Sequence, residues 1–126
     1  MTNSNSIVGK KSYSFSLEII ELYKYLTVEK KDYILSNQIL RSGTSIGTNV
    51  NEPLSAESKK DFIHKMGIAF KEAKETSYRL NLLVDSNYIN GEFFKRLDEL
   101  CNELFKILAS IIITTKQKYL SKKPNS

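Results

Sequence analysis

The segment Ile39–Glu52 most constrains the fold of this chain, because it combines small residues with a helical repeat of apolar ones. One helix face is indicated by steps of four, four, three and four between Leu35, Ile39, Gly43, Ile46 and Val50. A glycine-rich phosphate loop would follow a strand and end in Gly-Lys-Ser or Gly-Lys-Thr, and neither feature is present. The segment is therefore predicted to be a helix.

Two glycines inside this predicted helix require a structural reason. Gly43 and Gly47 each cost about 1 kcal/mol relative to alanine. Ser42 and Ser45 beside them are also small, so a neighbouring helix can come close on this side. We predict that a tight contact between two helices offsets the cost.

Apolar residues with helical spacing divide the chain into four predicted helices, at about residues 12–28, 32–52, 58–86 and 90–119. Asp32 and Asn90 are candidate N-caps, and Pro53 is expected to end the second helix. Ser58 and Asp61 have the spacing of a capping box. The tail from Ser121 is expected to fray.

Short connections make consecutive helices antiparallel, which predicts an all-α, up-down-up-down four-helix bundle. With 126 residues the chain is long enough for one domain, residues 1–126, with its own core. The single cysteine excludes an internal disulfide and fits a reducing cytoplasm. No apolar run approaches the ~20 residues of a membrane span, and from the polar start we expect no secretory leader.

Some predicted helices carry more apolar surface than one bundle needs, which indicates a homo-oligomer. On the last helix Phe94, Cys101, Phe105 and Ile112 form a second line beside the first. The residues predicted to lie at an interface between copies are Leu17, Ile20, Ile68, Tyr78, Phe94, Phe105 and Ile112.

The sequence offers little for catalysis, and we expect no enzyme, no cofactor and no metal site. The one histidine, His64, falls on the polar side of its helix and Cys101 beside an apolar stripe, so they are not expected to meet. Converging His, Cys and carboxylate ligands, which a metal site needs, are not apparent.

Polar residues also share a side of the second helix. Arg41, Ser45, Asn49 and Glu52 are spaced by four, four and three, and each end of the line is expected to pair with another helix or another copy. A solvated face and a fixed interface network are both open interpretations of this line.

Lysines gather where the topology brings the start of the first helix, the second turn and the end of the last helix together. They are Lys10, Lys11, Lys59, Lys60, Lys116, Lys118, Lys122 and Lys123. Only Glu52, Glu57 and Asp61 oppose them, so the local excess matches the net charge of +5 of the whole chain. Such a concentration of charge attracts phosphate backbones, and the lysines are predicted to bind RNA or DNA.

The segment Leu40–Glu52, followed by Ala56–Phe62 and Lys71–Thr76, resembles the bacterial family of 23S ribosomal RNA intervening-sequence proteins. The likeness runs from Phe15 to about Tyr119. This family is similar to the accessory protein of diversity-generating retroelements, a basic homopentameric barrel that binds nucleic acid and a reverse transcriptase.

The resemblance implies a bundle, a pentamer and no catalysis. It makes Arg41, Gly43, Ser45, Gly47, Asn49 and Glu52 structural positions. Pro53 and Arg79 depart from the family pattern, where a small residue and a tryptophan are usual. Two functions remain: a nucleic-acid-binding accessory protein acting through the lysines, or a scaffold that binds another protein through the extra apolar stripes.

Overall fold

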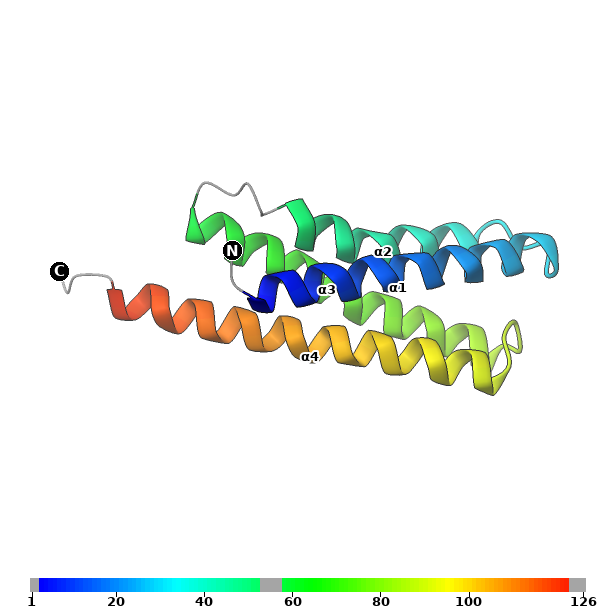
Figure 1. Ribbon diagram of the computed structural model, residues 1–126. Helices are drawn as coiled ribbons and strands as arrows, with labels where there is room; N and C mark the ends of the chain where they lie inside the picture. The colour runs from blue at the N-terminus through cyan, green and yellow to red at the C-terminus, as the bar shows by residue number, and fades with distance from the viewer. Residues whose placement is uncertain (1–2, 53–57, 123–126) are drawn as a thin grey trace.

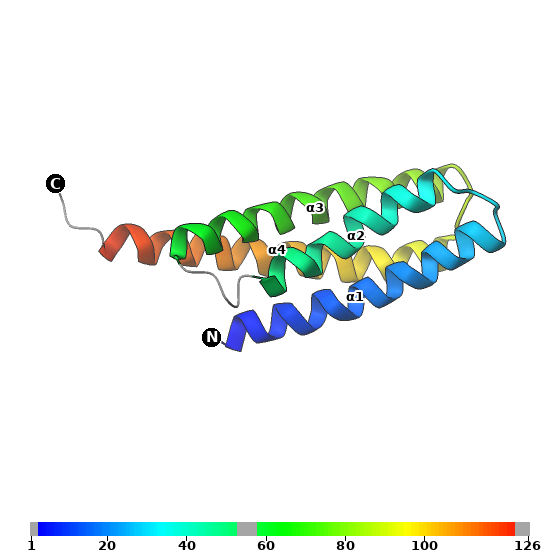
Figure 2. The same cartoon turned by 90° about the horizontal axis from the view of Figure 1, so that it is seen from above.

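The computed structural model describes residues 3–52 and 58–122. They form four helices and no strand: α1 (Asn3–Val28), α2 (Leu35–Asn51), α3 (Lys59–Asp85) and α4 (Gly91–Lys122). Consecutive helices run antiparallel, and α1 and α4 lie side by side to close the bundle (Figures 1 and 2). The predicted all-α, up-down-up-down bundle is confirmed for this part of the chain.

Each helix faces the core with residues at alternating steps of three and four, the seam of a left-handed bundle. On α1 this repeat is Val8, Ser12, Phe15, Ile19, Leu22 and Leu26, all buried. On α4 it is Leu97, Cys101, Leu104, Leu108 and Ile111. Cys101 is therefore part of the core seam of α4, whereas the sequence placed it beside that seam.

The glycines of α2 lie against α1, as predicted. A Cβ atom on Gly43 would lie 2.7 Å from Cγ1 of Ile19, and one on Gly47 would lie 3.2 Å from Oγ of Ser16. Both glycines are buried. Their missing side chains let the two helices approach closely, which explains why α2 tolerates them.

The first helix begins nine residues earlier than the predicted Ser12. Val8 extends the core repeat by a turn, and the Ser12 hydroxyl donates to the Gly9 carbonyl at 3.0 Å, so this polar residue is buried without an unpaired group. A Cβ on Gly9 would lie 2.8 Å from Oδ1 of Asn51 at the end of α2. Gly9 therefore serves a close contact and does not mark a helix start.

The other predicted helix ends are confirmed to within a few residues. Helix α2 begins at Leu35 and not near Asp32, although the Asp32 carboxylate still accepts from the Ser36 amide at 2.8 Å. Ser58 caps α3 by accepting from the Asp61 amide at 3.1 Å. Asn90 caps α4 by accepting from the Phe93 amide at 2.8 Å. Pro53 lies outside the described residues.

The backbone conformation of the turn between α3 and α4 accounts for the asparagine in it. Asn87 has φ of 65°, a left-handed conformation that asparagine tolerates better than most residues. The amide of Tyr88 then donates to the Leu83 carbonyl at 2.9 Å, which closes the end of α3. This short turn fixes α3 and α4 as antiparallel neighbours.

Candidate nucleic-acid interface

One end of the bundle gathers the segments that carry the predicted lysines. The start of α1, the end of α2, the start of α3 and the end of α4 all lie at this end (Figures 1 and 2). Helix α4 projects furthest, beyond the starts of α1 and α3. The antiparallel arrangement therefore brings together lysines that are more than a hundred residues apart in the sequence.

We call the eight predicted lysines the lysine-rich end. Lys10, Lys59, Lys60 and Lys116 are exposed and form no ion pair with any described residue. Lys11 forms an ion pair with Glu103 of α4, and Lys118 also interacts with a partner group. Lys122 is the last residue of α4, and Lys123 lies outside the described residues.

The dipole of α3 gives no structural reason for its first two lysines. Lys59 and Lys60 occupy the first turn, where the helix already carries partial positive charge and acidic residues are favoured. Asp61 is the one acidic residue in that turn. The charge of these lysines is therefore unfavourable beside the positive end of the helix dipole, and it is available to an anionic partner. Lys116 differs, because a cation near the C-terminus of α4 suits the dipole.

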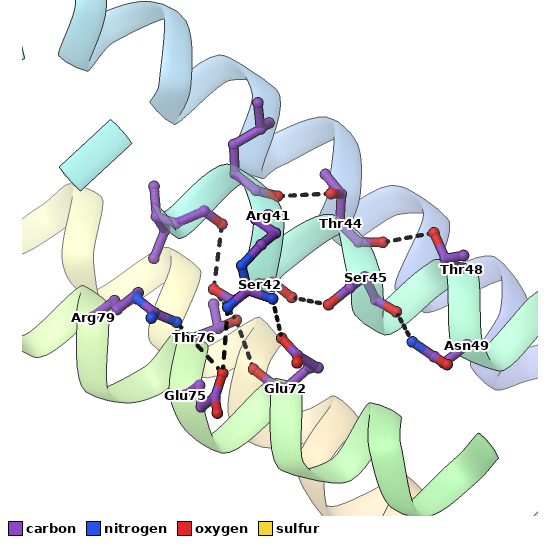
Figure 3. A network of polar contacts seen from close by, with 12 residues as sticks. Arg41, Ser42, Thr44, Ser45, Thr48, Asn49, Glu72, Glu75, Thr76 and Arg79 are labelled. Carbon is purple, nitrogen blue, oxygen red and sulfur yellow. Dashed lines mark hydrogen bonds and ion pairs between the residues drawn. The ribbon is translucent and has the colours of Figure 1, made fainter. Parts of the chain in front are cut away.

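Arg41 and Ser42 of α2 contact side chains of α3 within one chain (Figure 3). The Arg41 guanidinium lies 3.5 Å from Oε2 of Glu72 and 3.6 Å from Oε2 of Glu75. Arg79 contacts the same Glu75 oxygen at 3.6 Å through Nη1, which is buried and makes no hydrogen bond to a described residue. The partner of Arg41 is therefore another helix of the same chain.

The rest of the polar line is also held within the chain. The Glu52 carboxylate pairs with Lys65 of α3 at 3.0 Å. Asn49 donates to the Ser45 carbonyl at 2.8 Å, and the Ser45 hydroxyl donates to the Ser42 carbonyl at 2.9 Å. The two ends of the line, Arg41 and Glu52, therefore pair with α3, whereas Ser45 and Asn49 bond to carbonyls of their own helix.

A buried hydroxyl pair joins α2 to α3 beneath these ion pairs. Oγ of Ser42 lies 3.1 Å from Oγ1 of Thr76, which also donates to the Glu72 carbonyl at 2.8 Å. Both residues are fully buried. Because buried polar groups are costly when unpaired, this pair helps to fix how α2 sits on α3.

The residues predicted to contact a second copy fall into two groups. Tyr78 and Leu17 are exposed, at 66% and 49%. Ile20 and Ile68 are half-buried, as are Phe94, Phe105 and Ile112, and these last three pack against the core of their own chain. Phe105 stacks on Phe70 of α3, with ring centroids 4.4 Å apart. Helix α3 thus covers part of the second apolar line of α4.

Cys101 and His64, the two residues considered for catalysis, differ in burial: the thiol is buried and the imidazole is exposed. Burial raises the pKa of the Cys101 thiol from its ordinary value near 9 to about 12, and the nearby charge of Asp98 adds to this. The thiol donates to the Ala73 carbonyl at 3.2 Å. His64 is exposed on α3. Among the described residues, no group of three or more metal-ligating side chains is placed to hold an ion.

A cavity of about 490 Å³ lies between α1 and α4. Phe15 and Leu104 are among the apolar residues that line it, and ion pairs join Lys11 to Glu103 and Arg96 to Glu18 across the two helices. The mixed charges of this lining do not suit a polyanion.

Within the described part of the chain, none of the helices has the length and apolar character needed to cross a membrane.

The geometry defines an antiparallel four-helix bundle with charge concentrated at one end. The family model of the 23S rRNA-intervening sequence protein matches residues 4–110. A crystal structure of a protein of unknown function from the S23 ribosomal protein family of Bacteroides thetaiotaomicron is 46% identical and has a TM-score of 0.85. That match covers 86% of this chain and 97% of the other.

The chain belongs to the family of 23S rRNA-intervening sequence proteins. The predicted resemblance is thereby confirmed. None of the curated proteins compared with the chain matches it.

Proposed function

We propose that this protein is a non-enzymatic, homo-oligomeric accessory protein of the bacterial cytoplasm that binds RNA or DNA through its lysine-rich end. The observation that carries the proposal is the state of Lys10, Lys59, Lys60 and Lys116, which are exposed and unpaired among the described residues. Unpaired ammonium groups can neutralise phosphates without first breaking an ion pair.

Self-association supports this function because it multiplies the lysine-rich end. The exposed side chains of Tyr13 and Leu17 on α1 are one turn apart, and Ile20 follows within another turn. This apolar line lies on the outside of the bundle and is a suitable contact for a second copy. The resemblance to pentameric relatives favours a ring of five.

Catalysis is not proposed, on two grounds. The Cys101 thiol is buried and has a pKa of about 12, so it carries almost no thiolate at neutral pH. The single histidine, His64, is exposed and has no hydrogen bond or ion pair among the described residues. Neither residue has the partner that an activated nucleophile or general base requires.

The test is the salt dependence of RNA binding. A slope of about −3 in the plot of log affinity against log salt is expected if the four unpaired lysines each neutralise one phosphate of a single strand. The triple variant Lys59→Gln, Lys60→Gln, Lys116→Gln should lose about 2 from this slope. A control variant with the same charge change, Lys24→Gln, Lys30→Gln, Lys31→Gln, should retain it.

A protein-binding scaffold is the second candidate, favoured by the exposure of Tyr78 and Tyr13, at 66% and 64%. Its lysines would then serve solubility. Affinity for RNA that is absent, or that does not respond to salt, would contradict the proposed function and favour the scaffold.

A further inference from the structure

Each pair of neighbouring helices meets along a line on the bundle surface, which we call the seam between them. The four seams differ in whether their cationic side chains form ion pairs. Lys11 and Arg96 are paired across the α1–α4 seam, and Arg41, Lys65 and Arg79 are all paired along the α2–α3 seam. The α1–α2 seam is built on glycine contacts instead.

On α3 and α4, six lysines between residues 59 and 74 and between residues 106 and 116 are exposed and form no ion pair among the described residues. We call this set the lysine face: Lys59, Lys60, Lys71, Lys74, Lys106 and Lys116.

The register between α3 and α4 sets how far along the bundle each of these lysines lies. Phe70 and Phe105 stack on each other and fix which residues are opposite. Lys59 and Lys116 are each eleven residues from the stacked rings, both toward the lysine-rich end. Lys71 and Lys106 each follow one of the rings directly. The lysine face thus extends about 22 Å along the bundle from its lysine-rich end.

Acidic side chains are nearly absent from this stretch. No Asp or Glu follows Glu103 in the sequence. On α3 between residues 59 and 74 the acids are Asp61 and Glu72, and Glu72 pairs with Arg41 on the other side of the helix. On α4 the nearest acid beyond the rings is Glu103, which pairs with Lys11 of α1, and Glu75 of α3 pairs with Arg41 and Arg79. These acids are therefore held by other cations, and lysines outnumber acids along the lysine face.

The rings of Phe70 and Phe105 form an apolar surface among these lysines, which we call the apolar floor. The rings of Phe70 and Phe105 are half-buried, and the Lys74 ammonium lies 6.0 Å and 5.8 Å from their centroids. Gly67 lies one turn before Phe70, and a Cβ atom there would meet nothing within 4 Å. Unlike Gly43 and Gly47, this glycine is not explained by a contact inside the chain. It leaves open space beside the rings.

We infer that the lysine face binds a single-stranded nucleic acid, with phosphates on the lysines and a base against Phe70 and Phe105 beside Gly67. Combining a positive track with aromatic side chains is how proteins hold single strands without reading their sequence. A duplex keeps its bases stacked inside and gains nothing from the apolar floor. The inference rests on the proposed function and extends its site from the end of the bundle to its side.

The test uses three lysines that are not part of the lysine-rich end. The full-length variant Lys71→Gln, Lys74→Gln, Lys106→Gln is compared with the wild type and with Lys24→Gln, Lys30→Gln, Lys31→Gln. Binding of a labelled oligouridine of about 16 nucleotides, the upper size of a single-strand site, is followed by fluorescence anisotropy at several salt concentrations.

With the lysine face included, seven lysines each neutralise a phosphate and the wild-type slope becomes about −5. We expect the lysine-face variant to lose about 2 from this slope, which is roughly 100-fold in affinity at 0.1 M salt. The affinity of the control variant should stay within about a factor of two of the wild type, because salt screens exposed charges beyond about 10 Å. Wild-type slope and affinity in the lysine-face variant would overturn this inference and leave the proposed function intact. No salt-dependent binding by the wild type would overturn both.

Three further measurements separate the single strand from other occupants. Gly67→Leu should keep the melting temperature of the wild type or raise it, while its affinity for the oligouridine falls. Unchanged affinity would contradict the role of the open floor. Equal affinity for a duplex RNA of the same length would contradict the single-strand assignment. A changed sedimentation mass of the lysine-face variant would make this face a contact between copies and overturn the inference.

Discussion

Gly43 and Ile19 touch so closely that no side chain fits between α2 and α1 at this point. A Cβ atom on Gly43 would lie 2.7 Å from Cγ1 and 2.9 Å from Cγ2 of Ile19. Both of these carbons are bonded to the Ile19 Cβ, so no rotation of the far end of that buried side chain relieves the contact. The position of α1 against α2 therefore depends on this glycine.

Replacing two glycines by alanine should have opposite effects. Gly43→Ala forces Ile19 or the helix to move, at about 1–3 kcal/mol, partly offset by about 1 kcal/mol of helix propensity. Gly67→Ala gains the propensity with nothing to displace. We expect thermal unfolding to show a lower melting temperature for the first variant and a rise of about 3–5 °C for the second. A stable Gly43→Ala protein would mean that α1 and α2 are less closely packed.

The same contact can be tested by a double-mutant cycle. Ile19→Ala removes both clashing carbons, at about 2–5 kcal/mol for the lost burial. In that background Gly43→Ala should no longer destabilise, because the space for its methyl group is open. The two changes should therefore couple by more than about 0.5 kcal/mol, measured by chemical denaturation. Simple additivity would show that the two residues do not meet.

The network between α2 and α3 should contribute modestly to stability. In Arg41→Met the largely buried Glu72, whose side chain is 13% exposed, loses its cation. We expect a loss of about 1 kcal/mol that shrinks at high salt. Lys24→Met breaks a pair with Glu21 in which both side chains are exposed, and it should change stability by less than about 0.5 kcal/mol. Equal losses would show that burial of Glu72 is irrelevant.

The buried thiol predicts a pH dependence at the alkaline end. The pKa of Cys101 is about 12 in the folded protein and near 9 when the chain unfolds. The unfolded state therefore releases its proton first, and stability falls between these values by up to about 1.4 kcal/mol per pH unit. The stability of Cys101→Ala should fall less steeply over the same window. Folded wild-type protein should also resist thiol labelling at pH 8, and rapid labelling would contradict the burial.

Helical spacing predicted the four helices because the core seam of each repeats regularly. The start of α1 was missed because Val8 is followed by Gly9 and then by two lysines, a pattern that reads as a loop. Only the end of α2, with Asn51 against Gly9, gives that glycine a reason inside a helix. This contact joins residues 42 positions apart and leaves no local signal.

The lysine-rich end followed from topology alone, since antiparallel helices bring their ends together. The lysine face did not, because pairing depends on the register between helices. Lys65 and Lys71 lie on the same helix, yet the first meets Glu52 and the second meets no acid among the described residues. Charge counts along a sequence do not separate the two.

Sedimentation velocity of the full-length protein, with and without single-stranded RNA, tests most directly whether copies of this bundle assemble and bind nucleic acid. We predict a mass of several subunits for the protein alone, and a further increase with RNA that disappears at high salt. A particle of one subunit, 14.4 kDa, that is unchanged by RNA at low salt would contradict both assembly and binding.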